Sequence, residues 1–362
     1  MSGRQWDESD VRIRPNKKGS RPRTKDRPKH EDATIGRVIG VDRGRYTTVV
    51  DEGTKTERTV LAMRARELRR QAVVPGDRVA LVGDISGGQD ALARLVRIEE
   101  RSTLLRRSAD DTDPVERAVV ANADQVVVVV AAAAPEPRPG FIDRTLVAAH
   151  DAGITPVLVI TKADLREPTD LLETYVPLGL DVVVSRAGTG EVDENGSLPV
   201  DEEALATLHG LLDGHVSALL GHSGVGKSTL VNALTGAGRA TGGVNKVTGR
   251  GRHTSSSAIA LKVPDSPTGT WVVDTPGVRS FGLAHVDEQG VVDAFEDLVP
   301  ATADCPRGCT HAADAPGCAL DAWVEEGKAG PHGADRLASL RKLLASRIEA
   351  SEDVKELGEH GA

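Results

Sequence analysis

Aromatic residues are scarce in this chain of 362 residues, which has three Trp, two Tyr and three Phe, 2% of the whole. Val, Ala and Leu are plentiful instead, so we expect an interior built from aliphatic side chains. At this length the chain can form two or three domains, and at least one of them can bury a sizeable core.

Long apolar runs are also missing. No stretch approaches the roughly 20 consecutive apolar residues that a membrane-spanning helix needs. The first residues are polar and basic rather than signal-like. We therefore expect a cytoplasmic protein without a membrane partner.

Cysteine is rare, and all three cysteines fall within 14 residues as Cys305, Cys309 and Cys318, with His311 among them. An odd count in so tight a cluster argues against a secreted disulfide framework. Three thiolates and one imidazole form a ligand set of tetrahedral structural zinc, and four protein ligands leave no open position for catalysis. The cluster predicts one structural Zn²⁺, and the alternative is three unrelated cytosolic thiols.

The net charge of −9 hides a strong asymmetry. Residues 1–107 carry 25 Lys and Arg against 16 Asp and Glu, a net of +9, whereas residues 108–362 carry 20 against 38, a net of −18. A basic first part joined to an acidic remainder suggests that the first part meets a polyanion. The alternative is that these charges only cover solvated faces.

Four regions follow along the chain. Residues 1–32 are rich in Pro, Lys and Arg and predict a disordered basic arm. Residues 33–107 hold five short alternating runs between turn signals, which suit an OB-type β-barrel. We expect phosphate contacts from the arginines of this region: Arg58, Arg64, Arg66, Arg69, Arg70, Arg94, Arg97, Arg101, Arg106 and Arg107.

Residues 108–300 alternate between buried strands and helices, which predicts a multidomain α/β protein whose central domain is a doubly wound, mostly parallel sheet. Strands are expected at 125–134, 156–160, 181–185, 215–221 and 270–274, and helices at 141–153, 170–176, 201–212, 229–236 and 287–298. Residues 301–362 hold the cysteine cluster and a helix over 335–350, in which Leu337, Leu340, Leu344 and Ile348 recur at helical spacing.

The nine residues GHSGVGKST follow a strand and open a helix, and they contain the complete G-x-x-x-x-G-K-[ST] pattern. In this pattern backbone N–H groups cradle phosphates, the lysine reaches the β and γ oxygens, and the hydroxyl after it ligates Mg²⁺. The alternative is a glycine-rich turn without a ligand. The residues concerned are Gly221, His222, Ser223, Gly224, Val225, Gly226, Lys227, Ser228 and Thr229.

Two further segments complete the phosphate and magnesium chemistry. Asp274-Thr275-Pro276-Gly277 closes a strand, so that Asp274 can hold Mg²⁺ and the Gly277 N–H can sense the γ-phosphate. Residues 236–256 are rich in Gly and poor in apolar residues, which is typical of a switch that orders when Thr254, or Ser255, reaches the metal. The alternative for residues 236–256 is a surface insertion.

No guanine-reading Asn/Thr-Lys-x-Asp loop follows the switch. Thr161-Lys162-Ala163-Asp164 instead stands upstream, at the end of a buried strand, and Ser185-Arg186-Ala187 ends the next strand as a second loop that would support the base. The nucleotide-binding parts therefore run in a rotated order: base loops, phosphate loop, switch, metal loop.

In these motifs and their order, the sequence resembles the circularly permuted ribosome small subunit-dependent GTPase A family. The resemblance rests on ANADQVVVVV, IDRTLVAA, TKADL, GHSGVGKSTL, GRHT, DTPGVRSFGL and the Cys/His cluster before a terminal helix. It implies a GTPase that binds GTP or GDP with Mg²⁺, is stimulated by the small ribosomal subunit (16S rRNA and neighbouring proteins) and acts late in that subunit's maturation. The family usually has Asn where Thr161 stands. It also usually has one more residue between the first two cysteines, here Cys305 and Cys309, and one fewer between the second and third cysteines, here Cys309 and Cys318.

Catalysis is expected to depend on the switch, with Lys227 and Thr254 on the phosphates and metal. Many GTPases orient the attacking water with a Gln where this chain has Val278, which can neither donate nor accept a hydrogen bond. His253, which matches a family histidine proposed for this role, is the leading candidate to place the water. Because the metal loop leads directly into the tail, we also expect nucleotide-dependent changes to reach residues 287–350.

Two other functions compete with the assembly GTPase. A nucleotide-gated RNA-binding module would hydrolyse GTP only incidentally, and turnover with and without small subunits distinguishes it. A P-loop kinase or ATPase is disfavoured by the sequence TKAD and by the absence of a further lid or acceptor motif. We expect the protein to be a monomer.

Overall fold

The computed structural model describes residues 30–68, 71–108, 116–188, 199–237, 258–266, 269–276 and 282–359. The chain divides into two compact units, residues 1–32 and residues 33–362. The predicted basic arm therefore lies almost wholly outside the described residues, and the fold below is that of the second unit.

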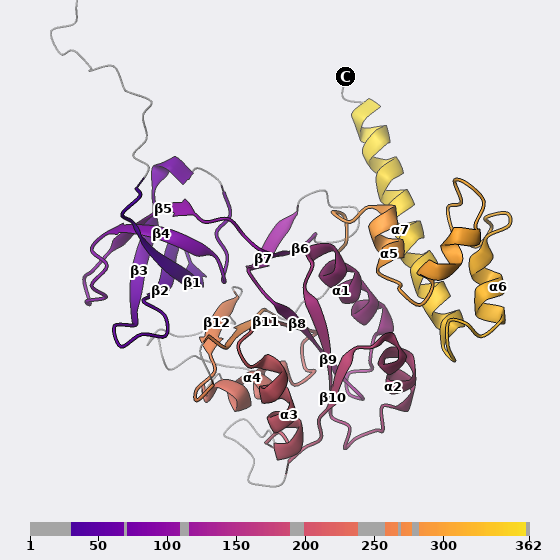
Figure 1. Cartoon of the computed structure of the whole chain (residues 1–362), viewed down its shortest axis with the longest axis horizontal. Coiled ribbons are helices and arrows are strands. Elements are labelled where there is room, and N and C mark those ends of the chain that lie inside the picture. The colour runs from indigo at the N-terminus through magenta and orange to yellow at the C-terminus, as the bar shows by residue number, and fades with distance from the viewer. Residues whose placement is uncertain are drawn as a thin grey trace, which may run out of the picture. The chain divides into compact units, whose positions relative to one another are not determined.

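Thirteen strands and seven α-helices are described (Figure 1). The strands are β1 (Thr34–Asp42), β2 (Arg45–Val50), β3 (Arg58–Arg64), β4 (Arg78–Gly83), β5 (Ala93–Ile98), β6 (Leu104–Arg107), β7 (Arg117–Ala121), β8 (Gln125–Ala131), β9 (Thr155–Thr161), β10 (Asp181–Val184), β11 (Val216–Gly221), β12 (Ile259–Lys262) and β13 (Trp271–Asp274). The helices are α1 (Pro139–Ala152), α2 (Thr169–Tyr175), α3 (Glu202–Leu212), α4 (Lys227–Thr235), α5 (Glu288–Asp293), α6 (Ala319–Glu325) and α7 (Gly333–Glu359), with 3₁₀ turns η2 (Arg66–Leu68), η3 (Val176–Leu178) and η4 (Val299–Asp304).

The first five strands form the predicted barrel. Their order is β1-β2-β3-β5-β4, and β4 pairs back with β1, so the sheet closes on itself. Only β3 and β5 run parallel, which gives the barrel its OB-like topology. Tyr46, Val60, Leu81 and Leu95 lie in a buried apolar cluster of the barrel that is separate from the clusters of the central sheet.

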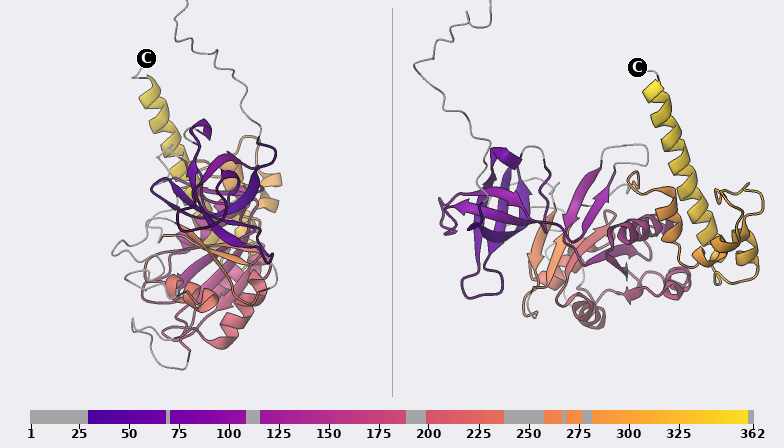
Figure 2. Two further views of the ribbon diagram at one scale, coloured as in Figure 1. Left: turned by 90° about the vertical axis from the view of Figure 1, so that its left-hand side faces the viewer. Right: turned by 45° about the horizontal axis from the view of Figure 1, so that its top comes forward.

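The central sheet is doubly wound, as predicted. Strands β10, β9, β8, β11 and β13 lie side by side and parallel. Every residue of β8 is buried. Val126 and Val128 pack on the face covered by α1 and α2, and Val127 and Val129 pack on the face covered by α3 and α4. Figures 1 and 2 show helices on both faces of the sheet.

A strand that the sequence pattern did not reveal joins the barrel to this sheet. The four residues of β12 run antiparallel to β13 and pair with β1 through Gly40 and Ile259. The barrel and the central sheet therefore form one continuous sheet of eleven strands. So short a strand, next to the predicted switch, carries too few residues to show an alternating pattern.

The predicted domain boundary at residues 107 and 108 falls at a hairpin. Strand β6 pairs antiparallel with β7. Ser108, the residue after the end of β6, forms an antiparallel bridge with Gly282. Ser108 is fully buried and its hydroxyl accepts from the Ala284 N–H at 3.2 Å. The hairpin is thereby tied to the chain that leaves the metal loop.

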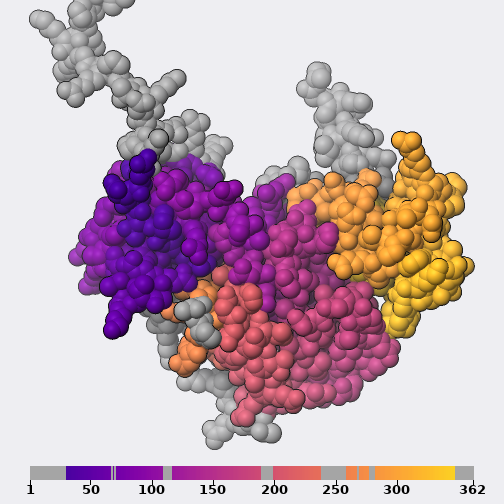
Figure 3. All heavy atoms as spheres, in the orientation of Figure 1, coloured from indigo at the N-terminus to yellow at the C-terminus, as the bar shows by residue number. Residues whose placement is uncertain are grey.

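The C-terminal region packs on the α1 side of the sheet. Figure 3 shows its orange and yellow atoms against the magenta atoms of the central domain. The helix predicted at 287–298 is shorter, because α5 ends at Asp293 and tight i−3 bonds lead into η4. The helix predicted at 335–350 is longer and spans α7. Leu320 of α6 and Leu337, Leu340 and Leu344 of α7 join the same core as α1. The described helices include none with both the length and the apolar character of a membrane span.

Candidate functional site

The predicted nucleotide-binding residues follow the carboxyl ends of four parallel strands. The loop Thr161–Asp164 (the base loop) ends β9, Ser185–Ala187 (the support loop) follows β10, Gly221–Thr229 (the phosphate loop) links β11 to α4, and Asp274–Gly277 (the metal loop) ends β13. Ligands of open α/β sheets bind in the crevice at this edge. The parallel strands thus gather four loops that are far apart in sequence.

Glycines set the shape of the phosphate loop. Gly224 has φ 82° and Gly226 has φ 91°, values that side chains other than glycine rarely adopt. A Cβ on Gly221 would lie 2.6 Å from the Val129 carbonyl oxygen. The loop then enters α4 at Lys227, whose helix N-terminus favours negative charge. Of the preceding residues, His222 packs its ring 4.4 Å from that of Phe141.

Lys227 links the phosphate loop to the metal loop. Its side chain is 7% exposed, and its Nζ donates to Asp274 Oδ1 and, at 2.5 Å, to the Thr275 carbonyl. Asp274 sits on the neighbouring strand in register with Leu219. The Thr275 hydroxyl donates to the Leu219 carbonyl at 2.7 Å. Lys227, predicted to bind the phosphates, and Asp274, predicted to hold Mg²⁺, are therefore in direct contact.

The base loop touches the phosphate loop directly. Thr161 Oγ1 donates to the Val225 carbonyl at 2.5 Å, and Lys162 Nζ donates to the Gly224 carbonyl at 2.7 Å. Lys162 also donates to the Ala134 carbonyl in the β8–α1 loop. The Thr161 hydroxyl, at the position where the family usually has Asn, therefore holds one hydrogen bond across the two loops.

Asp164 and the support loop are held together in the same way. Asp164 Oδ1 accepts from the Ala187 N–H at 2.9 Å, and Ser185, 4% exposed, accepts from the Ala163 N–H through its carbonyl. Arg186 is fixed from outside, because its N–H donates to Asp201 and its guanidinium pairs with Glu167 at 2.8 Å. Asp201 and Glu167 carried no motif that sequence reasoning could find.

Several predicted residues lie outside the described part of the chain. They are Gly277, Val278, His253, Thr254, Ser255 and nearly all of the predicted switch over 236–256. Ser228 and Thr229 are described and lie half-buried in the first turn of α4.

The cysteine cluster comes together as predicted. One ligand atom from each of Cys305, Cys309, His311 and Cys318 lies within 4.8 Å of the others. His311 Nδ1 lies 3.6 Å from Cys305 Sγ and 3.8 Å from Cys318 Sγ. Zn–S bonds of about 2.3 Å and Zn–N bonds of about 2.0–2.1 Å in a tetrahedron place S and N about 3.6 Å apart. The cluster therefore fits zinc in donor type and spacing.

The surroundings of the cluster favour metal binding. Burial, and the nearby Arg341 guanidinium, lower the pKa of His311, which keeps the imidazole in the neutral form that binds metals. Burial raises the pKa of the Cys318 thiol to about 11, and a bound cation would reverse that penalty. Arg341 of α7 donates to the His311 carbonyl and pairs with Asp321 of α6 at 2.7 Å. One arginine thus holds the cluster, α6 and α7 together.

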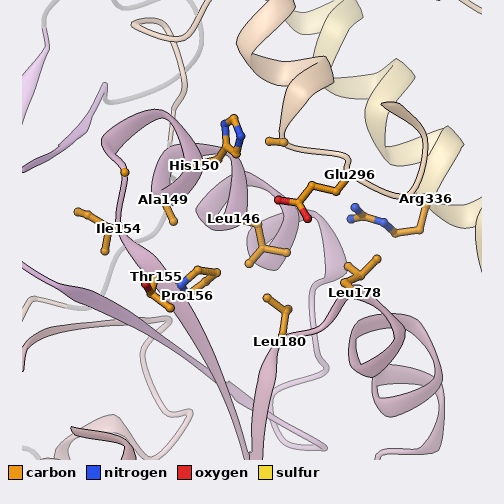
Figure 4. A pocket seen from close by; sticks show the side chains of 12 residues that line it. Leu146, Ala149, His150, Ile154, Thr155, Pro156, Leu178, Leu180, Glu296 and Arg336 are labelled. Carbon is orange, nitrogen blue, oxygen red and sulfur yellow. The ribbon is translucent and has the colours of Figure 1, made fainter. Parts of the chain in front are cut away.

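A cavity of about 320 Å³ lies at the start of β9, the end of the strand opposite to the base loop (Figure 4). It is lined by Leu146 and Ala149 of α1, by Pro156 at the start of β9, and by Glu296 and Arg336 from the C-terminal region. Figure 4 shows the Glu296 and Arg336 side chains extending into the same side of the cavity. It is separate from the nucleotide loops.

Arg336 also belongs to a buried ionic network that the sequence did not reveal. Its guanidinium is 4% exposed and pairs with Asp143 at 2.7 Å and with Asp297 at 2.9 Å. Tyr175 donates to Asp143 at 3.1 Å, and Ser339 donates to it as well. Burial raises the pKa of Asp143, whereas Arg336 acts in the opposite direction. The only sign of this network in the sequence was the charged residue Asp143 among the apolar residues of the α1 helix.

Comparisons with known proteins agree with this geometry. The RsgA GTPase family model matches residues 98–284. A small ribosomal subunit biogenesis GTPase RsgA from Pseudomonas aeruginosa is 38% identical over 286 residues, 77% of each chain. The protein of that name from Pseudomonas putida is 37% identical over 288 residues, 77% of this chain and 76% of its own.

Two solved structures share the fold. YjeQ from Thermotoga maritima is 26% identical with a TM-score of 0.60, covering 86% of this chain and 98% of its own. YloQ, described as a circularly permuted GTPase, is 23% identical with a TM-score of 0.61, covering 89% and 98%. The likeness to YloQ concerns the fold alone, whereas the family model and the relatives from Pseudomonas concern the sequence. The chain therefore belongs to the RsgA GTPase family and is a GTP-hydrolysing enzyme.

Proposed function

We propose that this enzyme acts as a checkpoint in late maturation of the small ribosomal subunit, and that the subunit stimulates its GTP hydrolysis. The contact between the base loop and the phosphate loop carries the proposal, since it assembles one nucleotide site from motifs in permuted order. The relatives' name, small ribosomal subunit biogenesis GTPase, supports the assignment to ribosome assembly. The small subunit is an assembly in the cytoplasm of bacteria, so we place the activity there.

In this function each loop takes one part of the nucleotide. The phosphate loop cradles the phosphates, and Lys227 turns from Asp274 to the β and γ oxygens. Ser228, Thr254 and Asp274 hold Mg²⁺. Asp164 accepts from guanine N1–H and the exocyclic amine, Lys162 lies along the ring, and the support loop backs the base. When Mg²⁺ is bound it neutralises charge that develops on the phosphates.

The attacking water needs a partner other than residue 278, since valine cannot orient it. We propose that His253 does so once the switch closes with Thr254 on the metal. The Gly277 N–H senses the γ-phosphate at the start of the segment that leads to Gly282 and the β6–β7 hairpin. That hairpin carries Arg106, Arg107 and Arg117, so a polyanion that binds it would act on the chain after the metal loop through the Ser108–Gly282 bridge.

The barrel and the cysteine cluster serve as RNA-docking modules in this proposal. The cluster holds one structural Zn²⁺, which fixes the short segment between η4 and α6. Elemental analysis of purified protein should find one zinc per chain, and Cys309→Ser should lose it together with thermal stability. A metal-free protein with unchanged melting would contradict the zinc assignment.

GTP turnover with and without purified small subunits tests the proposal. We expect strong stimulation of the wild-type enzyme, slow turnover with or without subunits for His253→Ala, and a shift of preference from GTP to XTP for Asp164→Asn. Turnover that subunits leave unchanged would support a nucleotide-gated RNA-binding module instead. An Asp164→Asn enzyme that keeps its preference for GTP would remove the base loop from the site.

A further inference from the structure

A cavity of about 330 Å³ opens on the outer surface of the barrel, where the end of β3, η2 and the start of β5 meet. Ala65 and Ala93, both nearly fully buried, form its floor. The Ala65 N–H donates to the Leu95 carbonyl at 2.8 Å, which holds η2 against β5. The volume lies at the small end of the roughly 300–1,000 Å³ of small-molecule sites. All of its lining residues belong to the barrel, so this cavity is distinct from the nucleotide site.

Two apolar side chains stand exposed at the rim of this cavity. Met63 is 47% exposed and Leu92 is 42% exposed. Five large apolar side chains among the described residues are at least 40% exposed, and two of them meet here. Isolated exposed apolar residues are ordinary, but two that share one cavity with charged neighbours are typical of a binding site.

Two arginines on the same rim are available to bind a partner. Arg66 and Arg94 are exposed and line the cavity, and neither guanidinium has a hydrogen bond or ion pair to another described residue. Five other predicted phosphate-binding arginines among the described residues differ, because their guanidinium groups are already engaged. The pairs are Arg58 with Asp51, Arg64 with Tyr46, Arg97 with Glu99, Arg101 with Asp77 and, beyond the barrel, Arg106 with Glu116.

The strand register places these groups in one row. Arg45 of β2 lies opposite Met63 of β3, and Met63 lies opposite Arg94 of β5. Side chains of directly paired residues project from the same face of a sheet, about 5 Å apart. The exposed surface therefore alternates cation, apolar side chain and cation across three strands.

This alternation fits single-stranded nucleic acid. A polynucleotide repeats a negative phosphate and a flat, largely apolar base face, and arginine can both pair with the phosphate and stack on the base. Base stacking usually uses aromatic side chains. The described aromatic residues of the barrel offer none, because Tyr46 is buried in its core. Met63, Leu92 and the guanidinium planes take that place.

We propose that this cavity, lined by Met63, Arg66, Leu92 and Arg94, is a subsite for one unstacked nucleobase of single-stranded RNA. Met63 and Leu92 pack against the base, and Arg66 and Arg94 hold the flanking phosphates, with Arg45 extending the track. The inference rests on the proposed function, which supplies RNA as the partner. A duplex cannot fill the cavity because its bases stay stacked inside the helix, and an acidic peptide would leave the apolar rim unused.

Fluorescence anisotropy with the full-length protein tests the subsite. The probe is a labelled, unstructured RNA of about ten nucleotides, within the range of roughly 4–16 per OB fold. We expect Met63→Ala and Leu92→Ala each to weaken binding by about tenfold. Their slope of log affinity against log salt should match the wild type. Arg94→Gln and Arg66→Gln should weaken binding and reduce the slope by about 0.7 each, the value for one phosphate on a single strand.

The barrel offers matched controls. Ile35→Ala removes an apolar side chain that is 40% exposed outside the cavity, and Arg97→Gln removes a charge on β5 that already pairs with Glu99. Both should bind like the wild type. An RNA with abasic sites should bind Met63→Ala and wild-type protein equally. All of the altered residues are exposed or half-buried, so melting temperatures should not change.

The inference is overturned if Met63→Ala and Leu92→Ala bind RNA as Ile35→Ala does, or if their loss persists on abasic RNA. Polyglutamate that competes as well as the RNA would assign the cavity to an acidic peptide and also overturn it. GTP turnover with and without small subunits is measured separately on the wild type. Failure of that stimulation would contradict the proposed function while leaving the RNA-binding result intact, and the reverse outcome would remove only the subsite.

Discussion

Thr161 shows how one hydroxyl can join two loops that are about 60 residues apart in the chain. Its side chain is 7% exposed, and its single hydroxyl hydrogen donates to the Val225 carbonyl at 2.5 Å, with the Val130 carbonyl as a second acceptor at 3.2 Å. The Gly226 Cα faces it, since a Cβ there would lie 3.5 Å from Thr161 Oγ1. The residue therefore positions the phosphate loop against the base loop.

Thr161→Val should weaken both nucleotide binding and folding. Valine keeps the shape but leaves the buried Val225 carbonyl without this donor, which costs about 1–3 kcal/mol. Thr161→Asn, which restores a donor, should bind GDP as well as the wild type does. Titration calorimetry with GDP measures both variants. Equal affinity for valine and threonine would show that the loops are held by other contacts, such as that of Lys162.

Arg336 is a second residue whose removal should have a large effect. Arg336→Leu leaves Asp143 and Asp297 buried without their cation, and breaking a buried pair in this way costs about 3–5 kcal/mol. Arg166→Ala is the matched control, because its pair with Glu136 is exposed on both sides and should be worth about 1 kcal/mol or less. Urea unfolding gives both free energies. A similar small loss for both would mean that Arg336 adds little to the stability of the C-terminal region.

At the scale of elements, α7 is fixed at its start to α2. His332 Nε2 lies 3.1 Å from Glu173 of α2, and its Nδ1 lies 3.6 Å from Asp335. The hydrogen bond to Glu173 raises the pKa of His332 above its usual value. The bridge joins the C-terminal region to the helix that follows the base loop.

This bridge should make stability depend on pH. Because the pKa is raised in the folded state, the stabilisation is fully present below the unfolded value of about 6.5 and is lost as pH rises through the folded value. His332→Gln should therefore lower the free energy of unfolding at pH 6 by about 0.5 kcal/mol, given the exposure of the pair, and leave it unchanged at pH 9. Glu173→Gln should give the same profile. A loss for His332→Gln that is equal at both pH values would rule out a charged bridge.

For the molecule as a whole, a set of side-chain contacts joins the barrel to the central sheet. Glu52 of the barrel accepts from Trp271 Nε1 at 2.5 Å and from Arg37 Nε at 2.9 Å, and Arg37 lies 5.9 Å from the centre of the Trp271 ring. Lys262 of β12 pairs with Glu57 at 2.8 Å, which lowers the pKa of Glu57. These contacts fall on β12 and β13, the two strands next to the predicted switch and the metal loop.

Glu52→Ala should loosen this junction. It removes two charge-assisted hydrogen bonds and leaves Arg37, 8% exposed, without its carboxylate, so we expect a loss of about 1.5–3 kcal/mol. The calorimetric transition should also broaden or split as the barrel unfolds apart from the central sheet. Glu99→Ala, whose partner Arg97 lies on the same barrel strand, should leave the shape of the transition unchanged. A single sharp transition for Glu52→Ala would show that the β1–β12 pairing alone couples the two parts.

Local patterns in the sequence determined most elements and motifs of this protein. Alternating apolar and polar residues indicated the barrel strands, and the apolar run at 125–134 indicated the central strand β8. The phosphate, base and cysteine motifs were recognised from the spacing of a few residue types within short segments. Such features depend on neighbours along the chain, so they can be read without coordinates. The division at 107 and 108 and the roles of His253 and Thr254 stay predictions.

Only the tertiary structure decided which distant residues meet. Strand β12, the Ser108–Gly282 bridge and the Asp143–Arg336–Asp297 network depend on partners more than 100 residues away or on packing that no period reveals. The structure also separated engaged arginines from available ones, since Arg101 and Arg94 look alike in sequence but only Arg101 holds a buried carboxylate. The physical reason is that charge pairing and burial are properties of surfaces brought together by folding, whereas periodicity is a property of the chain.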